Sequence, residues 1–276
     1  MIISTKLAQN QSESIGILLE GKSYAKLGKH KDAISFFDKA LKVDPQNVDA
    51  LYYKGLSLIQ LKKNKDAVVC FEKILEKDPN HVLALNNLGN SYAEQQQFER
   101  AINFYEKALK VDPTFVQVIY NKGIAEIGVG KYDEALRCFN QSLSVEPENV
   151  SATYFKGLVL GKQKKHNDAL LCFDKVIEKE PENFEALFYK ATSLAELGKH
   201  QDAITLFDKV LKDSPKNGTV IYSKARSKAE LGQDSEALEL LAQAILYYGK
   251  TIKGWAVKDS VFNRLKDDLR FKAVVK

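Results

Sequence analysis

The sequence lacks several features that would place a protein in a membrane or outside the cell. No apolar run approaches the roughly 20 residues that a helix needs to cross a bilayer. Residues 1–10 contain one lysine and no apolar stretch of the length found in signal peptides. We therefore expect a cytoplasmic protein without a membrane partner.

The sequence also has little net charge for a protein that would bind nucleic acid. The formal charge is +5, and residues 252–276 hold seven lysines and arginines against three aspartates. The remainder of the chain is therefore close to neutral. Because non-specific phosphate binding needs a clustered basic surface, only this C-terminal tail offers one, and we do not expect nucleic acid to be the main partner.

Proline is scarce, and its few positions are regular. All six prolines are spaced 34 residues apart: Pro45, Pro79, Pro113, Pro147, Pro181 and Pro215. A fixed period of 20 to 50 residues is typical of a solenoid, in which small units stack to bury their apolar faces. We therefore expect one elongated array of local contacts and no separate second domain.

Placing each proline at position 32 of its unit defines seven repeats. They cover residues 14–47, 48–81, 82–115, 116–149, 150–183, 184–217 and 218–251. Position 20 is alanine in every copy, position 8 is glycine or alanine, and position 24 is Phe, Tyr or Leu. These intervals predict two helices per repeat. Glycine at position 15 suits the end of the first helix, and asparagines such as Asn47 suit the N-cap of the next repeat.

Position 8 is a glycine in five copies although glycine inside a helix costs about 1 kcal/mol relative to alanine. We interpret it as a close-packing residue. Glycine at position 8 opposite alanine at position 20 would let the two helices approach closely, with the ring at position 24 filling the adjoining gap.

This pattern resembles the tetratricopeptide repeat, over residues 14–251. The resemblance implies an all-α, right-handed superhelical solenoid of antiparallel helix pairs. The sequence departs from the family pattern where lysine replaces the usual leucine at position 7 in five copies. We expect residues 1–13 to form a partly disordered N-terminal segment and residues 252–276 to form a C-terminal capping helix. The apolar face of that helix would comprise Trp255, Val257, Phe262, Leu265, Leu269 and Phe271.

No group of residues suggests catalysis, a metal site or a cofactor. Cys70, Cys138 and Cys172 share one repeat position, where other copies carry Phe or Leu, so we assign them to the core as reduced thiols. Three of the four histidines share position 17, at the corner between helices, and His81 precedes a first helix as the asparagines do. We therefore predict that the protein is not an enzyme.

A binding surface follows from helical geometry. At 100° per residue, positions 2, 5, 6, 9, 12 and 13 of the first helix share one face, here called the inner face, turned away from the second helix. In the family this face lines a concave groove that holds peptides or helices. The predicted groove residues are Lys22, Tyr52, Tyr53, Asn86, Asn87, Asn90, Tyr120, Asn121, Tyr154, Phe155, Phe188, Tyr189 and Tyr222. The alternative is that part of these aromatic residues only packs between repeats.

The predicted function is a non-enzymatic scaffold that binds a peptide or helix of another protein. Asn90 and Asn121 match two asparagines of the carboxylate clamp in chaperone-binding members, but the basic clamp positions hold Asn86, Ser151 and Phe155. Without those cations, binding of a C-terminal carboxylate is not expected. Two alternatives stay open, a regulatory subunit of an enzyme complex and nucleic-acid binding through the basic C-terminal tail. Self-association is also open.

Overall fold

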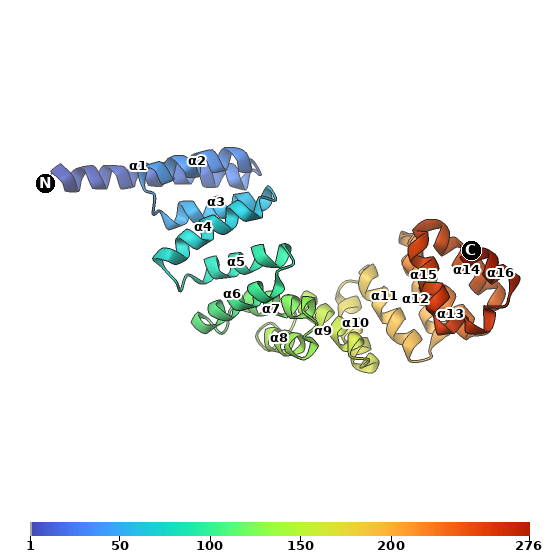
Figure 1. Ribbon diagram of the computed structural model, residues 1–276. Coiled ribbons are helices and arrows are strands. Elements are labelled where there is room, and N and C mark those ends of the chain that lie inside the picture. Colours follow the sequence, from blue (N-terminus) through green and yellow to red (C-terminus); the bar gives the residue numbers. More distant parts are fainter. Residues whose placement is uncertain (1) are drawn as a thin grey trace. The chain divides into compact units, whose positions relative to one another are not determined.

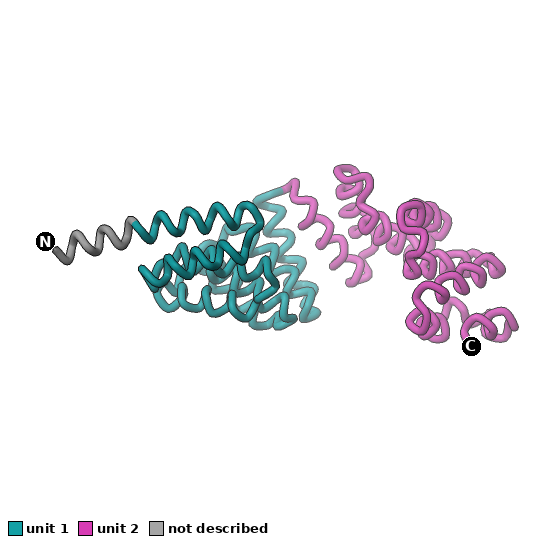
Figure 2. Tube along the Cα trace, turned by 90° about the horizontal axis from the view of Figure 1, so that it is seen from above, with its two compact units in different colours: residues 1–146 teal, residues 147–276 magenta. Residues whose placement is uncertain are grey.

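The computed structural model describes the backbone of residues 2–276 and the side chains from Glu13 onward. Over these residues the chain is all-α, with sixteen α-helices, one 3-10 helix and no strand (Figure 1). It divides into two compact units, residues 1–146 and 147–276, coloured separately in Figure 2. The expected single array thus becomes two units built from the same helix pairs. Residues 2–13, which were expected to be partly disordered, lie within the helix α1 (Ile2–Lys26), and of this segment only the side chain of Glu13 is described.

Within each unit the helices pair in chain order. In the first unit they are α1 (Ile2–Lys26), α2 (His30–Val43), α3 (Val48–Gln60), α4 (Asn64–Lys77), α5 (Val82–Glu94), α6 (Phe98–Val111), α7 (Val116–Gly128) and α8 (Tyr132–Val145). In the second they are α9 (Val150–Lys162), α10 (His166–Lys179), α11 (Phe184–Glu196), α12 (His200–Asp213), α13 (Gly218–Glu230), α14 (Asp234–Tyr248), α15 (Lys250–Lys258), η1 (Ser260–Leu265) and α16 (Leu269–Val275). Each helix packs against its neighbours in sequence, which makes each unit a solenoid.

The first helices begin at the predicted caps. The side chain of Asn47 accepts a hydrogen bond from the Ala50 N–H, and Asn149, Asn183 and Asn217 make the equivalent bond. His81 replaces asparagine in the third repeat, where its Nδ1 accepts from the Ala84 N–H at 3.1 Å. These bonds satisfy one of the N–H groups that a helix start leaves without an intrahelical acceptor.

The first helices also end as predicted, in a left-handed residue at position 15. Gly28, Gly130, Gly198 and Gly232 have φ between +72° and +77°. The other three repeats place Lys62, Gln96 and Lys164 in the same conformation, with φ near +60°. A side chain in this region is strained, because Cβ approaches the following carbonyl.

The glycine at position 8 makes room for a ring. A Cβ on Gly89 would lie 2.4 Å from Tyr105, and one on Gly55 would lie 2.7 Å from Phe71. The close contact is therefore with the aromatic residue at position 24, and the alanine at position 20 is not among the nearest atoms. This corrects the sequence interpretation: the glycine admits the buried ring into the helix interface.

In four repeats the lysine at position 7 forms an ion pair with the repeat before it. Lys54 Nζ lies 2.6 Å from Asp38 Oδ1, and Lys122 Nζ lies 2.8 Å from Glu106 Oε1. Lys190–Asp174 and Lys224–Asp208 form the same pair in the second unit, each at 2.5 Å. In every case the acid holds position 25 of the preceding repeat. The departure from the family pattern is thus an ion pair between repeats.

The three cysteines are buried and free, which confirms their assignment to the core. Burial raises the pKa of all three thiols, that of Cys138 to about 11. A thiol with so high a pKa carries little thiolate near neutral pH.

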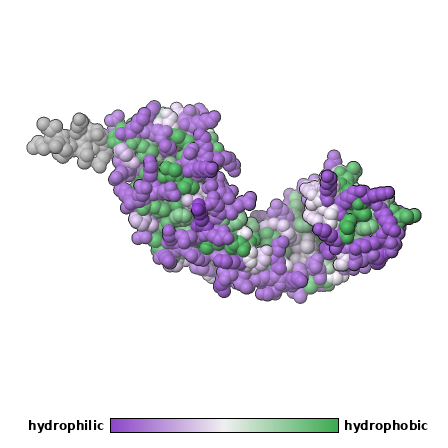
Figure 3. Space-filling view, in the orientation of Figure 1, coloured by the Kyte–Doolittle hydropathy of each residue, from purple (hydrophilic) through white to green (hydrophobic). Residues whose placement is uncertain are grey.

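The segment after the last repeat forms three short helices, α15, η1 and α16, instead of the single helix expected. The segment is interrupted at Asp259 and Asp268. Each of these side chains caps a new helix by accepting a hydrogen bond from the backbone N–H two residues later in the sequence. Phe262, Leu265 and Phe271 are buried against the last repeat, but Trp255, Val257 and Leu269 are exposed. Only half of the expected apolar face is therefore covered, and Figure 3 shows hydrophobic patches over these C-terminal helices.

Candidate functional site

The predicted inner-face residues lie on the first helices of each unit, and many of them pack against rings of the core. The ring at position 5 contacts the ring at position 24 of its own repeat, with centroids 6.0 to 6.2 Å apart. The pairs are Tyr52–Phe71, Tyr120–Phe139, Tyr154–Phe173 and Phe188–Phe207. Position 6 reaches position 24 of the preceding repeat, as in Tyr53–Phe37 and Tyr189–Phe173. These contacts give the aromatic residues a packing role, whatever else they do.

In the first unit, the polar residues of the inner face bond to one another. The side-chain amide of Asn121 donates to Asn86 Oδ1 at 3.1 Å and to Asn90 Oδ1 at 2.9 Å. Asn90 Oδ1 also accepts from the Tyr105 hydroxyl at 2.7 Å. Asn86 and Asn87 are buried. We call Asn86, Asn90, Tyr105 and Asn121 the asparagine network.

Two further contacts occupy the other predicted residues of this unit. Lys22 Nζ lies 4.2 Å from the centroid of the Tyr53 ring and 3.0 Å from Asp49 Oδ2. Asn87 Nδ2 donates to the Leu83 carbonyl at 2.8 Å and lies 3.4 Å from the Tyr52 hydroxyl. The structure therefore brings the predicted residues together in small groups whose polar atoms already have partners.

In the second unit four predicted aromatic residues form a continuous row on α9 and α11. Ring centroids are 5.3 Å apart for Phe155–Tyr154, 6.1 Å for Tyr154–Tyr189 and 5.2 Å for Tyr189–Phe188. We call these four residues the aromatic row. Tyr189 is 37% exposed, and the other three are half-buried. Burial raises the pKa of Tyr154, and the nearby Glu185 raises it further, so its hydroxyl stays protonated and donates to Glu185 at 3.2 Å.

Tyr222, the last predicted residue, is buried instead of exposed. Trp255 and Phe262 pack on its ring at 5.6 and 6.1 Å, and its hydroxyl donates to Asp259 at 2.8 Å. The C-terminal segment thus covers the inner face of the last repeat at this point. Sequence position alone could not show this cover, since the segment lies outside the repeat pattern.

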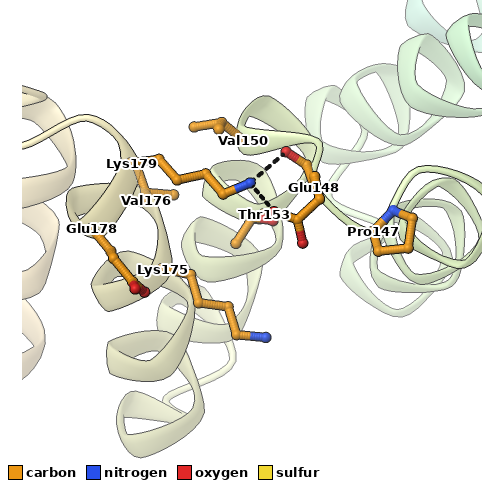
Figure 4. A pocket seen from close by; sticks show the side chains of 8 residues that line it. All are labelled: Pro147, Glu148, Val150, Thr153, Lys175, Val176, Glu178 and Lys179. Atoms are coloured by element: carbon orange, nitrogen blue, oxygen red, sulfur yellow. Dashed lines mark hydrogen bonds and ion pairs between the residues drawn. The ribbon is translucent and has the colours of Figure 1, made fainter.

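A pocket of about 490 Å³ opens beside α9 and α10 (Figure 4). Its wall includes Thr153, which occupies position 4 where the other copies carry Ile or Leu. Across it, Lys179 Nζ donates to the Glu148 carbonyl at 3.3 Å and pairs with the Glu148 carboxylate. Lys77 makes the same bond to the Gln46 carbonyl in the second repeat. Because the contact recurs in another repeat, we assign it a structural role.

A second pocket, of about 250 Å³, lies between α11 and α13 and was not predicted. Arg226 at position 9 is one of its residues. Two sequence features could have indicated this pocket: the arginine at an inner-face position of the seventh repeat, and the small Ala195 at position 12 of the sixth.

The basic residues of the C-terminal tail are partly neutralised. Arg264 lies 2.6 Å from Asp234 Oδ1, Arg270 lies 2.8 Å from Asp268 Oδ2, and Lys272 lies 3.3 Å from Asp267 Oδ1. These three account for nearly half of the seven tail cations. Among the described residues no group of three or more His, Cys, Asp or Glu side chains gathers as a metal site. In the same residues, no helix has the length and apolar character needed to cross a membrane.

Family models match most of the repeat region. Two models described as tetratricopeptide repeat match residues 24–88 and 82–115. A model described as anaphase-promoting complex, cyclosome, subunit 3 matches residues 129–210 and 162–244. Among curated proteins there is no match to the sequence.

Solved structures show the same fold. A tetratricopeptide repeat protein from Parabacteroides merdae is 18% identical, with 96% of this chain and all of that chain covered and a TM-score of 0.68. Pseudomonas aeruginosa pilF is 20% identical, with 75% and 94% covered and a TM-score of 0.66. YrrB, a TPR protein described as having an unusual peptide-binding site, is 27% identical, with 68% and 98% covered and a TM-score of 0.58. The helix pairs, the family models and these neighbours agree: the chain belongs to the tetratricopeptide repeat family and has the fold of a protein-interaction scaffold.

Proposed function

We propose that the protein is a non-enzymatic scaffold that binds a peptide segment or a helix of another protein through the inner face of its first helices. The observation that carries the proposal is the aromatic row of Phe155, Tyr154, Tyr189 and Phe188, whose rings touch one another along α9 and α11.

The chemistry of the row suits a protein ligand. Core packing accounts for part of the rings of Tyr154, Phe188 and Tyr189, but Tyr189 keeps 37% of its surface exposed although it stacks on the buried Phe173. A partly exposed aromatic surface held in place by a packed core loses little conformational entropy when a ligand covers it. Tyrosine is enriched at binding hot spots for the same reason. The relative YrrB, described as having a peptide-binding site, supports the choice of a peptide as ligand.

A selection from a random peptide library displayed on phage tests the proposal. The intact chain should enrich peptides with apolar or aromatic anchors. Phe155→Ala and Tyr189→Ala should each weaken the binding of the synthetic peptides by tenfold or more, since a hot-spot truncation costs about 2 kcal/mol or more.

Leu171→Ala is the matched control. Leu171 is 63% exposed on α10, a second helix of the same repeat that carries Phe155. The substitution removes exposed apolar surface and leaves the inner face unchanged, so peptide affinity should not change. Thermal unfolding of all variants separates lost binding from lost folding. Unchanged affinity in a folded Phe155→Ala, Tyr189→Ala double variant would remove the aromatic row as the binding surface.

A further inference from the structure

The pocket between α11 and α13 differs chemically from the aromatic row beside it. It lies wholly within residues 147–276, and α12 closes one side with His200 and the buried Phe207. Six of its residues hold inner-face positions: Thr192, Ala195, Glu196, Ser223, Arg226 and Glu230. The pocket therefore opens on the same helix faces that the proposed ligand would follow.

The pocket is rich in hydrogen-bond acceptors. The hydroxyls of Thr192 and Ser223 already donate to the carbonyls of Phe188 and Thr219, each at 3.0 Å, so toward the pocket they can only accept. Ser227 is 1% exposed, and its hydroxyl has no hydrogen-bond partner among the described residues. A buried hydroxyl without a partner destabilises the protein, and a ligand that bonds to it would offset that loss.

The pocket also carries excess negative charge. Its one cation, Arg226, is already engaged, with Nε 2.7 Å from Asp259 Oδ2 and Nη1 3.5 Å from Glu196 Oε1. Glu230 is exposed and has no ion-pair partner among the described residues. The residues that line the pocket thus carry two carboxylates, Glu196 and Glu230, against one guanidinium that Asp259 also engages, and this balance calls for one more positive charge.

Orphaned polar atoms occur in other repeats as well. In the part of the chain that the structure describes, the hydroxyl of Ser91 and the Nδ1 atoms of His30 and His166 are also buried without partners. One such atom therefore does not indicate a ligand. What distinguishes this pocket is that Ser227 and His200, each of which carries such a buried atom, are among the residues that line one cavity together with two carboxylates.

We propose that this pocket receives a lysine or arginine side chain of the bound peptide. The inference rests on the proposed function and names the chemistry of one ligand residue. An ammonium or guanidinium group offers several donors and one positive charge, which match the hydroxyl and imidazole acceptors and the carboxylates of Glu196 and Glu230. An acidic or purely apolar side chain would leave these groups unsatisfied.

The test uses the peptides selected on the intact chain, labelled with a fluorophore and measured by anisotropy. The enriched sequences should share a lysine or arginine at a fixed distance from the aromatic anchors. The Glu196→Gln, Glu230→Gln double variant should weaken binding by about tenfold to a hundredfold, because a hydrogen bond to a charged group contributes about 1.5–3 kcal/mol. Replacing the basic peptide residue with methionine should weaken binding of the wild-type chain by a similar factor.

The two changes should not add. Since both remove the same contact, the methionine peptide should bind the double variant about as well as it binds the wild-type chain. Glu239→Gln is the matched control: it makes the same kind of charge change at an exposed position on α14, away from the pocket, and should leave affinity unchanged.

The outcomes separate the two proposals. Peptides that depend on Phe155 and Tyr189 but show no basic residue would overturn the pocket assignment and keep the proposed function. The pocket assignment is equally overturned if Glu239→Gln weakens binding as much as the double variant does. If no peptide is enriched at all, the proposed function is wrong and the pocket assignment falls with it.

Discussion

The inner faces of repeats three and four and of repeats five and six occupy the same positions of one repeat but differ in what their side chains leave available. In repeats three and four, Asn121 bridges Asn86 and Asn90, and the polar atoms satisfy one another. In repeats five and six, the rings touch along the face and Tyr189 stays partly exposed. A polar residue at a binding position is therefore weak evidence for a site until its hydrogen-bond partners are known.

The largest expected effect concerns a feature that both regions share, the packing of the glycine at position 8 against the ring at position 24. Gly89→Ala and Gly157→Ala should each lower the free energy of unfolding by about 1–3 kcal/mol, because the added Cβ meets a buried ring. The Cβ would lie 2.4 Å from Tyr105 at Gly89 and 2.9 Å from Phe173 at Gly157. We expect the greater loss at Gly89, because the bond from Tyr105 to Asn90 holds that ring in place.

Urea denaturation measures both losses, and Gly161→Ala serves as the control. Nothing lies within 4 Å of a Cβ at Gly161, near the end of α9, so this change should stabilise the protein by about 0.5–1 kcal/mol. Equal losses at Gly89 and Gly157 would show that the asparagine network does not restrain the Tyr105 ring.

The next prediction separates the two regions by function. Asn121→Ala removes the donor to Asn86 and Asn90 and should cost about 1–3 kcal/mol of stability. It should leave the affinity of peptides that depend on the aromatic row unchanged. Denaturation and anisotropy on the same sample measure both quantities. A large loss of affinity with little loss of stability would reverse the comparison and make the asparagines part of the binding surface.

A third prediction concerns pH and a position that differs between the two regions. Glu126 at position 11 is 3% exposed, where repeats five and six carry Leu160 and Leu194. Burial raises the pKa of Glu126 above its ordinary value of 4.5. Its protonated form therefore contributes stability that is fully present below about pH 4.5 and is lost as pH rises through the raised pKa.

Glu126→Leu should accordingly stabilise the protein by about 1–3 kcal/mol at pH 7, since Oε2 of the carboxylate is buried without a hydrogen-bond partner among the described residues. The gain should shrink as pH falls toward 4.5. Denaturation of both proteins at a series of pH values measures the difference, in which the titration of all other groups cancels. A gain that does not depend on pH would indicate packing rather than ionisation as its cause.

The smallest effect concerns the end of the first helix in repeat five. Lys164 has φ of +61°, where repeats four and six carry Gly130 and Gly198. Lys164→Gly should relieve the strain and raise stability by up to about 1 kcal/mol. Lys162→Gly, two residues earlier at the last residue of α9, should lower it by up to about 1 kcal/mol. A destabilising Lys164→Gly would show that the lysine side chain offsets its own backbone strain.

The sequence predicted those parts of the molecule that depend on contacts over a few residues or on the register of the repeat. Helix starts at Asn47 and helix ends at Gly28 follow from capping and from left-handed backbone geometry, which act over a few residues. The burial of Cys70 follows from its register. Contacts between helices that are distant in the sequence were missed or reversed: the partner of Lys54, the ring against Gly89 and the cover over Tyr222 all depend on residues 16 or more positions away. The binding role of the inner face stays a prediction for the same reason.

The ion pair between position 7 and position 25 gives several pairs of neighbouring repeats complementary charges at equivalent positions. Except at the junction before the third repeat, neighbouring repeats within a unit match an acid at position 25 with a lysine at position 7, as in Asp38–Lys54 and Asp174–Lys190. Duplicating the second, fifth or sixth repeat would therefore create a new junction with complementary charges already in place, such as Glu72 opposite Lys54. The junction before the third repeat departs from this pattern, since Leu88 stands opposite Glu72 in register. Changes in the length of the array are best tolerated elsewhere than at that junction.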